Sequence, residues 1–328
     1  MPCLFRRTIL TASSAGLLAA VPGAARAQEG WPKAKPVRVI IPYSPASAPD
    51  NVFRLYAEGL TTRLGASFVV ENRSGGAGMI GTEAAARAVP DGYTLLVSIN
   101  APISVNRHLY TRMSYDPERD LRAVAMLAIA PLVLVTPPAN GRDMDTFLAR
   151  MRTPGKRMAY GSTGIGSASH LLFEAMKMRT GLDLEHVPYR GTPEALTDIL
   201  GGRVAAMLSL PGQVQAHLQS GALVPLMQTS ERRMTILPDV PTSAEVGLDE
   251  VVGSGWMGLF VPGATPEPVV ARLAEALRDT AADARLAEAL VAQGYTAGGM
   301  DPAQMTDFVA RESANWGEII RRLGLRVD

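Results

Sequence analysis

The sequence predicts an α/β protein of two lobes, each built on a sheet with helices on its faces. Short runs rich in β-branched residues alternate with amphipathic stretches of helical period, and this βαβ order is typical of a mostly parallel sheet. The alternation occurs once over residues 37–98 and again over 132–228. With 328 residues and 47% hydrophobic composition, the chain is large enough to bury two cores without disulfides or metals.

The first set of elements reads strand, helix, strand, helix, strand. Strands are predicted at 37–42, 67–71 and 93–98, with helices near 49–64 and 82–88. The second set has predicted strands at 132–135, 158–160, 184–188, 204–209 and 223–228. Between them a helix is predicted over 193–200, because Thr192 can cap it and Pro193 and Glu194 suit its first turn.

The C-terminal third is predicted to be helical. Its apolar residues recur at helical spacing: Val269, Leu273 and Leu277, then Leu286 and Leu290, then Met305, Phe308, Trp316, Ile319 and Leu323. Such stripes are core faces, and the Met and Trp side chains within them imply no cofactor.

The N-terminus has the pattern of an export signal. Arg6 and Arg7 precede an apolar run over 9–21, and Ala25-Arg26-Ala27 is a small-x-small cleavage site. We therefore predict that residues 1–27 are removed after Ala27 and that the mature protein is exported. The paired arginines leave the general secretory and the twin-arginine routes both open. No later segment offers the run of about 20 apolar residues that spans a bilayer.

Charge and cysteine content exclude several classes of partner and chemistry. Cleavage removes Arg6, Arg7 and Arg26 from the 32 basic residues and none of the 31 acidic ones, which leaves 29 basic residues and a net charge of −2. A nucleic-acid or anionic-membrane partner would require a basic face. The single cysteine, Cys3, leaves with the signal, so the mature chain has no disulfide, thiol nucleophile or cysteine metal ligand.

A glycine- and serine-rich loop over 160–170 is predicted to hold an anion at the start of a helix. Ser162, Thr163, Ser167 and Ser169 supply hydroxyls, and an N-cap at Ser167 would direct the helix dipole toward the same point. Phosphate loops carry a Gly-Lys-Ser or Gly-Lys-Thr ending, which is absent here, so a singly charged carboxylate fits better than a polyphosphate. The alternative is a structural turn that binds nothing.

Three other patterns in the sequence are incomplete matches to known functional sites. Gly76-Ala77-Gly78-Met79-Ile80-Gly81 matches the dinucleotide-binding pattern, but no acidic residue follows at about 20 residues. The four histidines lack the spacing of a zinc site, so neither a metal nor a cofactor is expected. A serine hydrolase using Ser162 or Ser167 with His170 remains an alternative, although the G-x-S-x-G elbow is missing.

Nine fragments in one order carry a family resemblance across the mature chain. They are Trp31-Pro32, Pro42-Tyr43-Ser44-Pro45, Val70-Glu71-Asn72-Arg73 with Gly75-Gly76-Ala77-Gly78, Pro90-Asp91-Gly92-Tyr93-Thr94-Leu95, Tyr115-Asp116-Pro117, Tyr160-Gly161-Ser162, His186-Val187-Pro188-Tyr189-Arg190-Gly191, Leu237-Pro238-Asp239-Val240-Pro241-Thr242 and Trp256-Met257-Gly258. The sequence resembles the Bug family, periplasmic solute receptors of tripartite tricarboxylate transporters. The resemblance implies a monomeric receptor rather than an enzyme, which delivers a small organic carboxylate to membrane transporter subunits.

The resemblance further implies a two-lobed periplasmic-binding-protein fold of type II topology whose lobes close like a hinge. Lobe 1 is expected over 28–131 and 255–328, and lobe 2 over 132–254, with crossovers near 131–136 and 252–258.

The resemblance also implies the ligand-binding residues. They are Tyr43, Ser44, Ala46, Ser47 and Asp50 in a first lip, Ser162, Thr163, Gly166, Ser167, Ser169 and His170 in a second, and Asn100, Ala101, Tyr189, Ser209, Ser254 and Trp256 between them. Tyr189 and Trp256 have an alternative role as core or turn aromatics.

Two departures from the family pattern bear on the ligand. The first lip usually reads Pro-Phe-x-Pro-Gly-Gly, whereas Ala46 and Ser47 replace both glycines and Pro49 lacks an N–H. Leu208-Ser209-Leu210 stands where relatives often have Phe-Asp-Asn. We therefore expect a less polar distal pocket that suits neither an amino acid nor a tricarboxylate. A sensory receptor without a transport role, or one without a ligand, remains an alternative.

Overall fold

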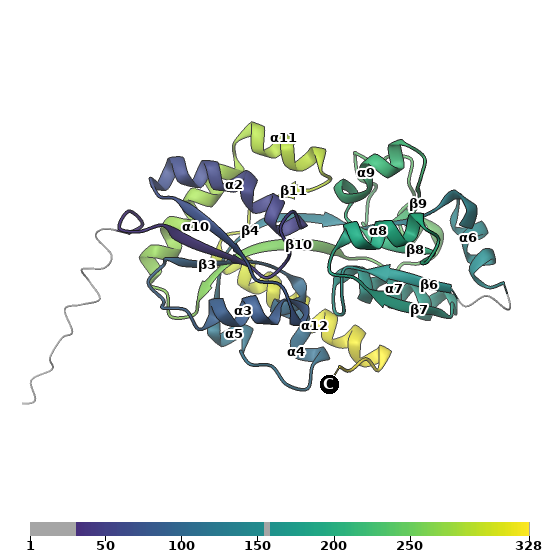
Figure 1. Ribbon diagram of the computed structural model, residues 1–328, viewed down its shortest axis with the longest axis horizontal. Helices are drawn as coiled ribbons and strands as arrows, with labels where there is room; N and C mark the ends of the chain where they lie inside the picture. Colours follow the sequence, from purple (N-terminus) through teal and green to yellow (C-terminus); the bar gives the residue numbers. More distant parts are fainter. Residues whose placement is uncertain (1–30, 154–157, 328) are drawn as a thin grey trace, which may run out of the picture.

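The computed structural model describes residues 31–153 and 158–327, so the predicted export signal lies outside the described residues. The chain forms an elongated molecule of two lobes side by side, each with a central sheet covered by helices (Figure 1). No helix in the described ranges is both long and apolar enough to cross a membrane.

The sheet of the first lobe has six strands in the order β11-β4-β10-β3-β1-β2. The strands are β1 (Val37–Ile41), β2 (Phe68–Asn72), β3 (Thr94–Ile99), β4 (Leu121–Pro131), β10 (Ser254–Pro262) and β11 (Thr296–Ala297). Its helices are α2 (Ala48–Leu64), α3 (Met79–Ala86), α4 (Asn106–Leu109), α5 (Pro117–Asp120), α10 (Glu267–Ala281), α11 (Ala284–Ala292) and α12 (Pro302–Leu323), and short turns lie at Gly76–Gly78 and Ala101–Val105. The three predicted strands and two predicted helices of this region are confirmed.

The sheet of the second lobe has five strands in the order β7-β6-β8-β5-β9. They are β5 (Val133–Thr136), β6 (Met158–Ser162), β7 (Leu184–Pro188), β8 (Ala206–Ser209) and β9 (Val224–Gln228). Its helices are α6 (Met144–Met151), α7 (Ala168–Thr180), α8 (Thr192–Leu200) and α9 (Pro211–Gln219), with turns at Pro138–Asn140 and Ala244–Val246. All five predicted strands and the predicted helix over 193–200 are confirmed within two residues.

The expectation of mostly parallel sheets is wrong, because both sheets are mixed. Strands β1, β2 and β3 pair in parallel, but β10 runs antiparallel to both β3 and β4. In the second sheet β6 is parallel to β7 and β8, whereas β5 is antiparallel to β8 and β9. The antiparallel pairs arise at β4, β5 and β10, where the chain passes between the lobes instead of returning through a helix.

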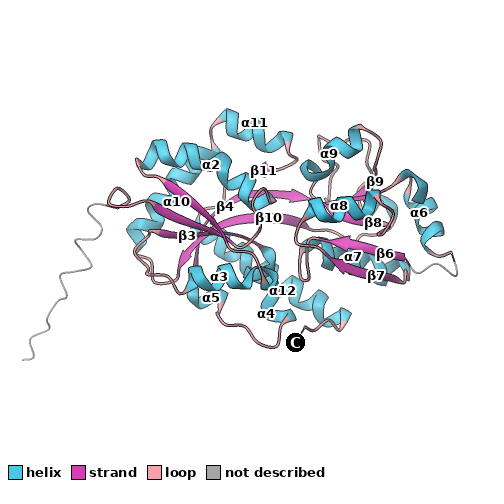
Figure 2. Ribbon diagram, in the orientation of Figure 1, coloured by secondary structure: helices cyan, strands magenta, loops and turns pink. Residues whose placement is uncertain are grey.

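Two neighbouring strands connect the lobes (Figure 2). Strand β4 ends at Pro131 and β5 begins two residues later in the other sheet, while β10 starts at Ser254, directly opposite Pro131 in the ladder. The long strands β4 and β10 were not predicted from the sequence. Both are buried along nearly their whole length, so they show no alternation of polar and apolar residues.

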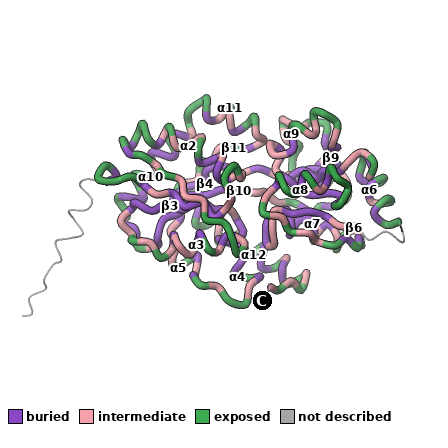
Figure 3. The backbone as a smooth tube through the Cα atoms, in the orientation of Figure 1, coloured by how far each residue is buried: buried purple, intermediate pink, exposed green. Residues whose placement is uncertain are grey.

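Each sheet carries a hydrophobic cluster on both faces, and the buried backbone follows the strands (Figure 3). The C-terminal helix α12 contributes to clusters in both lobes. Met305, near its start, packs in the cluster of Ile40 and Leu96, whereas Trp316 and Ile320, near its end, pack in the cluster of the second lobe. Helix α12 therefore contacts both sides of the crossover.

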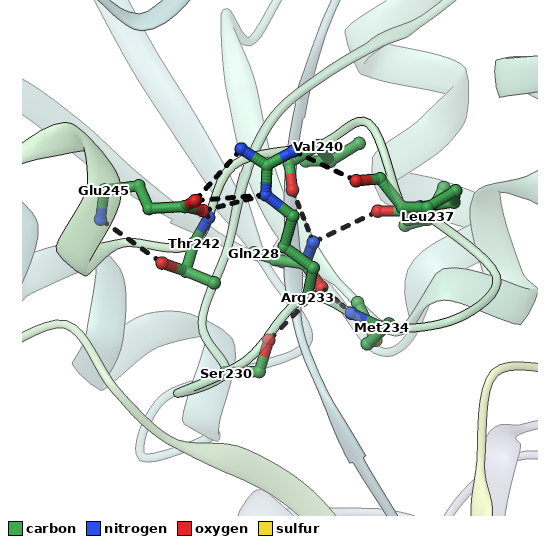
Figure 4. Close-up of polar contacts among 9 residues, drawn as sticks. Gln228, Ser230, Arg233, Met234, Leu237, Val240, Thr242 and Glu245 are labelled. Carbon is green, nitrogen blue, oxygen red and sulfur yellow. Dashed lines mark hydrogen bonds and ion pairs between the residues drawn. The ribbon is translucent and has the colours of Figure 1, made fainter.

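The loop between β9 and β10 is held by a polar network (Figure 4). The fully buried side chain of Gln228 donates to the carbonyls of Leu237 at 3.2 Å and Val240 at 2.5 Å. Its Oε1 accepts from the amide of Met234 at 2.7 Å and from Ser230 at 3.2 Å. Nearby, Arg233 pairs with Glu245, which also accepts from the Thr242 amide. These bonds hold the Leu237-Pro238-Asp239-Val240-Pro241-Thr242 segment against the sheet.

Candidate functional site

A cavity of about 140 Å³ lies between the lobes and is lined by residues from both sheets. One water molecule needs roughly 10–15 Å³ of such space, so the cavity has room for about ten waters or one small organic molecule. Its walls come from the loops that follow β1, β3, β6, β7 and β8 and from the start of β10.

Four helices begin at this cavity. Helix α2 follows β1, and α7, α8 and α9 follow β6, β7 and β8, so each helix starts at the carboxyl end of its strand. Residues at or next to all four helix N-termini line the cavity: Ala48 and Pro49, Ala168 and Ser169, Thr192 and Pro193, and Leu210 and Gln213. Because the first amides of a helix have no partner within it and the dipole is positive there, the cavity favours an anion.

The first lip turns through a left-handed residue that is not glycine. Ala46 has φ 60°, and its amide donates to the Asp50 carboxylate at 3.0 Å. Burial raises the pKa of Asp50, but hydrogen bonds from Arg54, the Ala46 amide and Asn72 outweigh it and hold that pKa below its usual value. Asp50 is therefore an ionised anchor that fixes the lip and has no free oxygen for a ligand. Ala46 therefore adopts a left-handed conformation that favours glycine, at a position where the family pattern has one, and its backbone is strained.

The second lip is connected by hydrogen bonds among its own side chains. The Ser167 hydroxyl caps α7 by accepting from the His170 amide at 3.3 Å and donates to the Gly164 carbonyl at 2.7 Å. Ser169 contacts the hydroxyls of Ser167 at 2.9 Å and Thr163 at 3.2 Å. The amides of Ala168 and Ser169 have no hydrogen-bond partner among the described residues. Those two amides are the open donors of this lip.

Two stacked histidines support the second lip from behind. The rings of His170 and His186 lie 4.0 Å apart, and the rings of Tyr160 and Phe173 continue the column. His170 Nδ1 accepts from the Gly166 amide at 3.2 Å, and His186 Nε2 lies 2.7 Å from the Ser162 hydroxyl. Burial, with a smaller contribution from Lys177, lowers the pKa of His170 to about 4. Burial and the neighbouring His170 lower that of His186 to about 3, so both rings are neutral near pH 7.

Three buried polar atoms of lining residues have no hydrogen-bond partner among the described residues. They are Tyr43 Oη, Ser47 Oγ and Asn100 Nδ2, and all three can donate. Burial raises the pKa of Tyr43, which keeps its hydroxyl protonated. The charged side chains of the lining are Arg190 and Glu194, both exposed at the rim. The interior of the cavity therefore offers neutral donors rather than a counter-charge.

The structure brings together ten of the residues implied by the family resemblance. The cavity is lined by Tyr43, Ser44, Ala46, Ser47, Asn100, Thr163, Ser167, Ser169, Ser209 and Trp256. The others lie outside the lining: Asp50, Ala101, Ser162, Gly166, His170, Tyr189 and Ser254.

The Tyr189 hydroxyl donates to Asp198 at 2.7 Å, and its pKa is raised to about 12 by burial and by that carboxylate. Trp256 is almost wholly buried, packs with Phe260 and Phe308, and donates to Glu312 at 3.1 Å.

Sequence reasoning missed the part of the lining formed by α8 and α9. The missed residues are Arg190, Gly191, Thr192, Pro193 and Glu194 before and in α8, and Gln213 in the first turn of α9, whereas Leu208 and Leu210 belong to the distal pocket that the sequence predicts. The signal was present, because Thr192-Pro193-Glu194 marks a helix start after a predicted strand. Helices that follow parallel strands of one sheet begin at the same edge, so this start belongs beside the loop over 163–167.

The geometry does not present a serine nucleophile to the cavity. Ser162 is fully buried, and its hydroxyl partner is His186 rather than His170. His170 is occupied by the Gly166 amide, and Ser167 donates to a carbonyl. Within the described ranges, no three His, Cys, Asp or Glu side chains gather as a metal site would require.

Comparison with known proteins places the chain in a family. Residues 52–325 match the model of the tripartite tricarboxylate transporter family receptor. Protein BugT of Bordetella pertussis is 36% identical over 296 residues, which cover 90% of this chain and 91% of that protein.

Solved structures agree with this assignment. The Rhodopseudomonas palustris protein Rpa4515 with adipate has a TM-score of 0.86 at 29% identity, covering 90% of this chain and 99% of its own. MatC from the same species, with bound malate, has a TM-score of 0.82 at 26% identity, covering 88% and 99%. The expected two-lobed periplasmic-binding-protein fold is thereby confirmed, and the hydrolase alternative is not supported. This chain belongs to the family of tripartite tricarboxylate transporter receptors, which are periplasmic solute-binding proteins and not enzymes.

Proposed function

We propose that this receptor captures a small organic carboxylate between its lobes and delivers it to the membrane subunits of a transporter. The observation that carries the proposal is the convergence of four helix N-termini with the unpaired donors Tyr43 Oη, Ser47 Oγ and Asn100 Nδ2. Aligned amides and neutral hydroxyls can hold a carboxylate without a formal counter-charge, partly through ordered waters. Relatives with malate and adipate support this class of ligand.

The distal wall favours a ligand whose body is mainly apolar. Ile99, Leu132, Leu208, Leu210 and Met257 line the cavity, and the polar side chains beside them are Ser209 and Gln213. A ligand bearing several charges would leave some of them against this wall without a partner, which costs free energy. We infer that a mono- or dicarboxylate with a hydrocarbon body binds better than a tricarboxylate.

A thermal-shift series tests the proposed ligand class. Mature protein is heated with adipate, malate, citrate and the uncharged adipamide, which matches adipate in length. A ligand present at 100 times its dissociation constant adds about 2.7 kcal/mol of stability. Stabilisation by adipate or malate but not by adipamide is expected. Equal stabilisation by adipamide, or none by any acid, would contradict the proposal.

Loss of uptake of the identified acid by cells that lack this receptor would distinguish transport from a purely sensory role.

We propose that residues 28–131 with 255–328 form one rigid lobe, that 132–254 form the other, and that the lobes close on the ligand. The passage of the chain between the sheets at β4 and β10 supports this division. We expect the radius of gyration to fall when a verified carboxylate is added, while the scattering mass stays that of a monomer. Small-angle scattering checks both quantities, and an unchanged radius would argue against hinge closure.

We also propose that the receptor works in the periplasm after cleavage behind Ala27. The Ala25-Arg26-Ala27 site motivates this proposal. The exported protein is then expected to begin at Gln28. Intact-mass measurement of protein recovered from the periplasm checks the start, and retention of any residue before Gln28 would refute it.

A further inference from the structure

The hydroxyls of the second lip form a chain whose proton directions can be deduced. The chain runs from Thr163 Oγ1 to Ser169 Oγ at 3.2 Å, on to Ser167 Oγ at 2.9 Å, and ends at the Gly164 carbonyl at 2.7 Å. Each hydroxyl has one proton to donate, and a carbonyl can only accept. The fixed end at Gly164 therefore determines the donor in the two links nearest to it.

The Ser167 proton must point at the Gly164 carbonyl, because two acceptors 2.7 Å apart without a proton between them would repel each other. Ser167 then has no proton for Ser169, so Ser169 must donate to Ser167. Ser169 in turn has no proton for Thr163, so Thr163 donates to Ser169 or turns elsewhere. The backbone amide of Thr163 also donates to Ser169 Oγ at 3.1 Å, so this oxygen already accepts one hydrogen bond from Thr163.

Of the three hydroxyls in the second lip, those of Ser167 and Ser169 donate their protons within the lip, whereas the proton of Thr163 is not required there. Thr163 is at the open end of the chain, is partly exposed, and makes the longest of the three links. A ligand oxygen can take its proton at the cost of that weak link alone. Redirecting the proton of Ser167 would break its bond to the Gly164 carbonyl, and redirecting that of Ser169 would break the link between Ser169 and Ser167.

Unpaired donors of the first lobe, which line the same cavity as Thr163, indicate that a ligand binds between the lips. Asn100 is 1% exposed, and its Nδ2 has no hydrogen-bond partner in the described chain. It lines the same cavity as Thr163, as does Tyr43 with its unpaired hydroxyl. Leaving buried donors unpaired is costly, so these groups indicate an acceptor that fills the space between the lips.

We propose that Thr163 is the hydroxyl of the second lip that donates to the ligand carboxylate, beside the open amides of Ala168 and Ser169. Ser167 and Ser169 act as positioning residues, because they hold Thr163 and the helix start in place without giving a proton to the ligand. The proposal rests on the proposed function, since it assigns the contacts of the same site.

The test compares Thr163→Val with Thr163→Ser. Calorimetric titration uses adipate or malate, whichever binds the wild-type protein more tightly. Loss of a hydrogen bond to a charged group corresponds to roughly a 10- to 150-fold loss of affinity. We expect a loss of this size in Thr163→Val, which keeps the shape of the side chain, and recovery in Thr163→Ser, which restores the hydroxyl. Thr62→Val, at an exposed threonine of α2, is the matched control for the substitution itself.

Ser169→Ala separates donation from positioning. We expect it to lose less affinity than Thr163→Val while lowering the midpoint of unfolding, because it removes bonds within the lip but no ligand donor hydroxyl. Unchanged affinity in Thr163→Val, or a larger loss in Ser169→Ala, would overturn the assignment while wild-type binding upholds the proposed function. Failure of the wild-type protein to bind any carboxylate would overturn both, and would be seen before any variant is made.

Discussion

Acidification from pH 7 to pH 5 is expected to lower the free energy of unfolding by about 3 kcal/mol through His170 and His186 alone. Their pKa values are lowered from 6.5 to about 4 and about 3 in the folded protein, mainly by burial. The unfolded chain therefore binds more protons than the folded chain below about pH 6.5. Stability contributed by a lowered histidine pKa is present above that pH and is lost progressively as the pH falls toward the folded values.

The groups that face the histidine pair do not reverse this sign. Lys177 disfavours a further positive charge on both rings and so lowers both pKa values. Glu174 raises the pKa of His186, but its carboxylate is already paired with Lys177 at 2.7 Å and with the Tyr160 hydroxyl at 2.6 Å. Urea unfolding at pH 7 and pH 5 measures the effect. The control is the double variant His170→Gln/His186→Gln, which lacks both imidazoles but keeps every carboxylate that titrates in this pH range. The same pH difference in both proteins would show that the pair does not cause it.

Replacing Gln228 by Leu is expected to lower the free energy of unfolding by about 3–5 kcal/mol. The substitution leaves the carbonyls of Leu237 and Val240 and the amide of Met234 without their partner. An unsatisfied buried polar group costs about 1–3 kcal/mol, and local relaxation recovers part of the sum. Urea denaturation of both proteins gives the difference.

Gln215→Leu is the matched control for this substitution. Gln215 is exposed on α9, where Leu and Gln have similar helix propensity, so its replacement is expected to change stability by less than about 0.5 kcal/mol. A Gln228→Leu variant as stable as this control would mean that the loop between β9 and β10 does not depend on the buried amide.

Most of the elements could be predicted because their cause is local. Strand β1 and helix α2 show a β-branched run, a helix period and a proline in the first turn, all of which are properties of neighbouring residues. Strands β4 and β10 could not be found in this way. Both lie deep in the first sheet, where burial on two faces removes the alternation of polar and apolar residues. Their antiparallel pairing joins residues more than 120 positions apart, which no local pattern records.

The candidate site was predicted in part for the same reason. The loop over 160–170 could be recognised because its hydroxyls and its helix start are close together in sequence. The roles of individual residues could not, because hydrogen bonds to distant groups decide them. Asp50 has its oxygens occupied by Arg54, Ala46 and Asn72, and Ser162 meets His186 instead of His170.

The sequence by itself determined the α/β class, the alternating elements, the family and the position of the glycine- and serine-rich loop at a helix start, because composition, periodicity and motifs are written along the chain. Only the tertiary structure decided that both sheets are mixed, that α8 and α9 complete the cavity, and that Thr163 is the open end of the hydroxyl chain. These facts depend on which groups meet across the fold. A donor is available to a ligand only if no distant acceptor has already taken its proton.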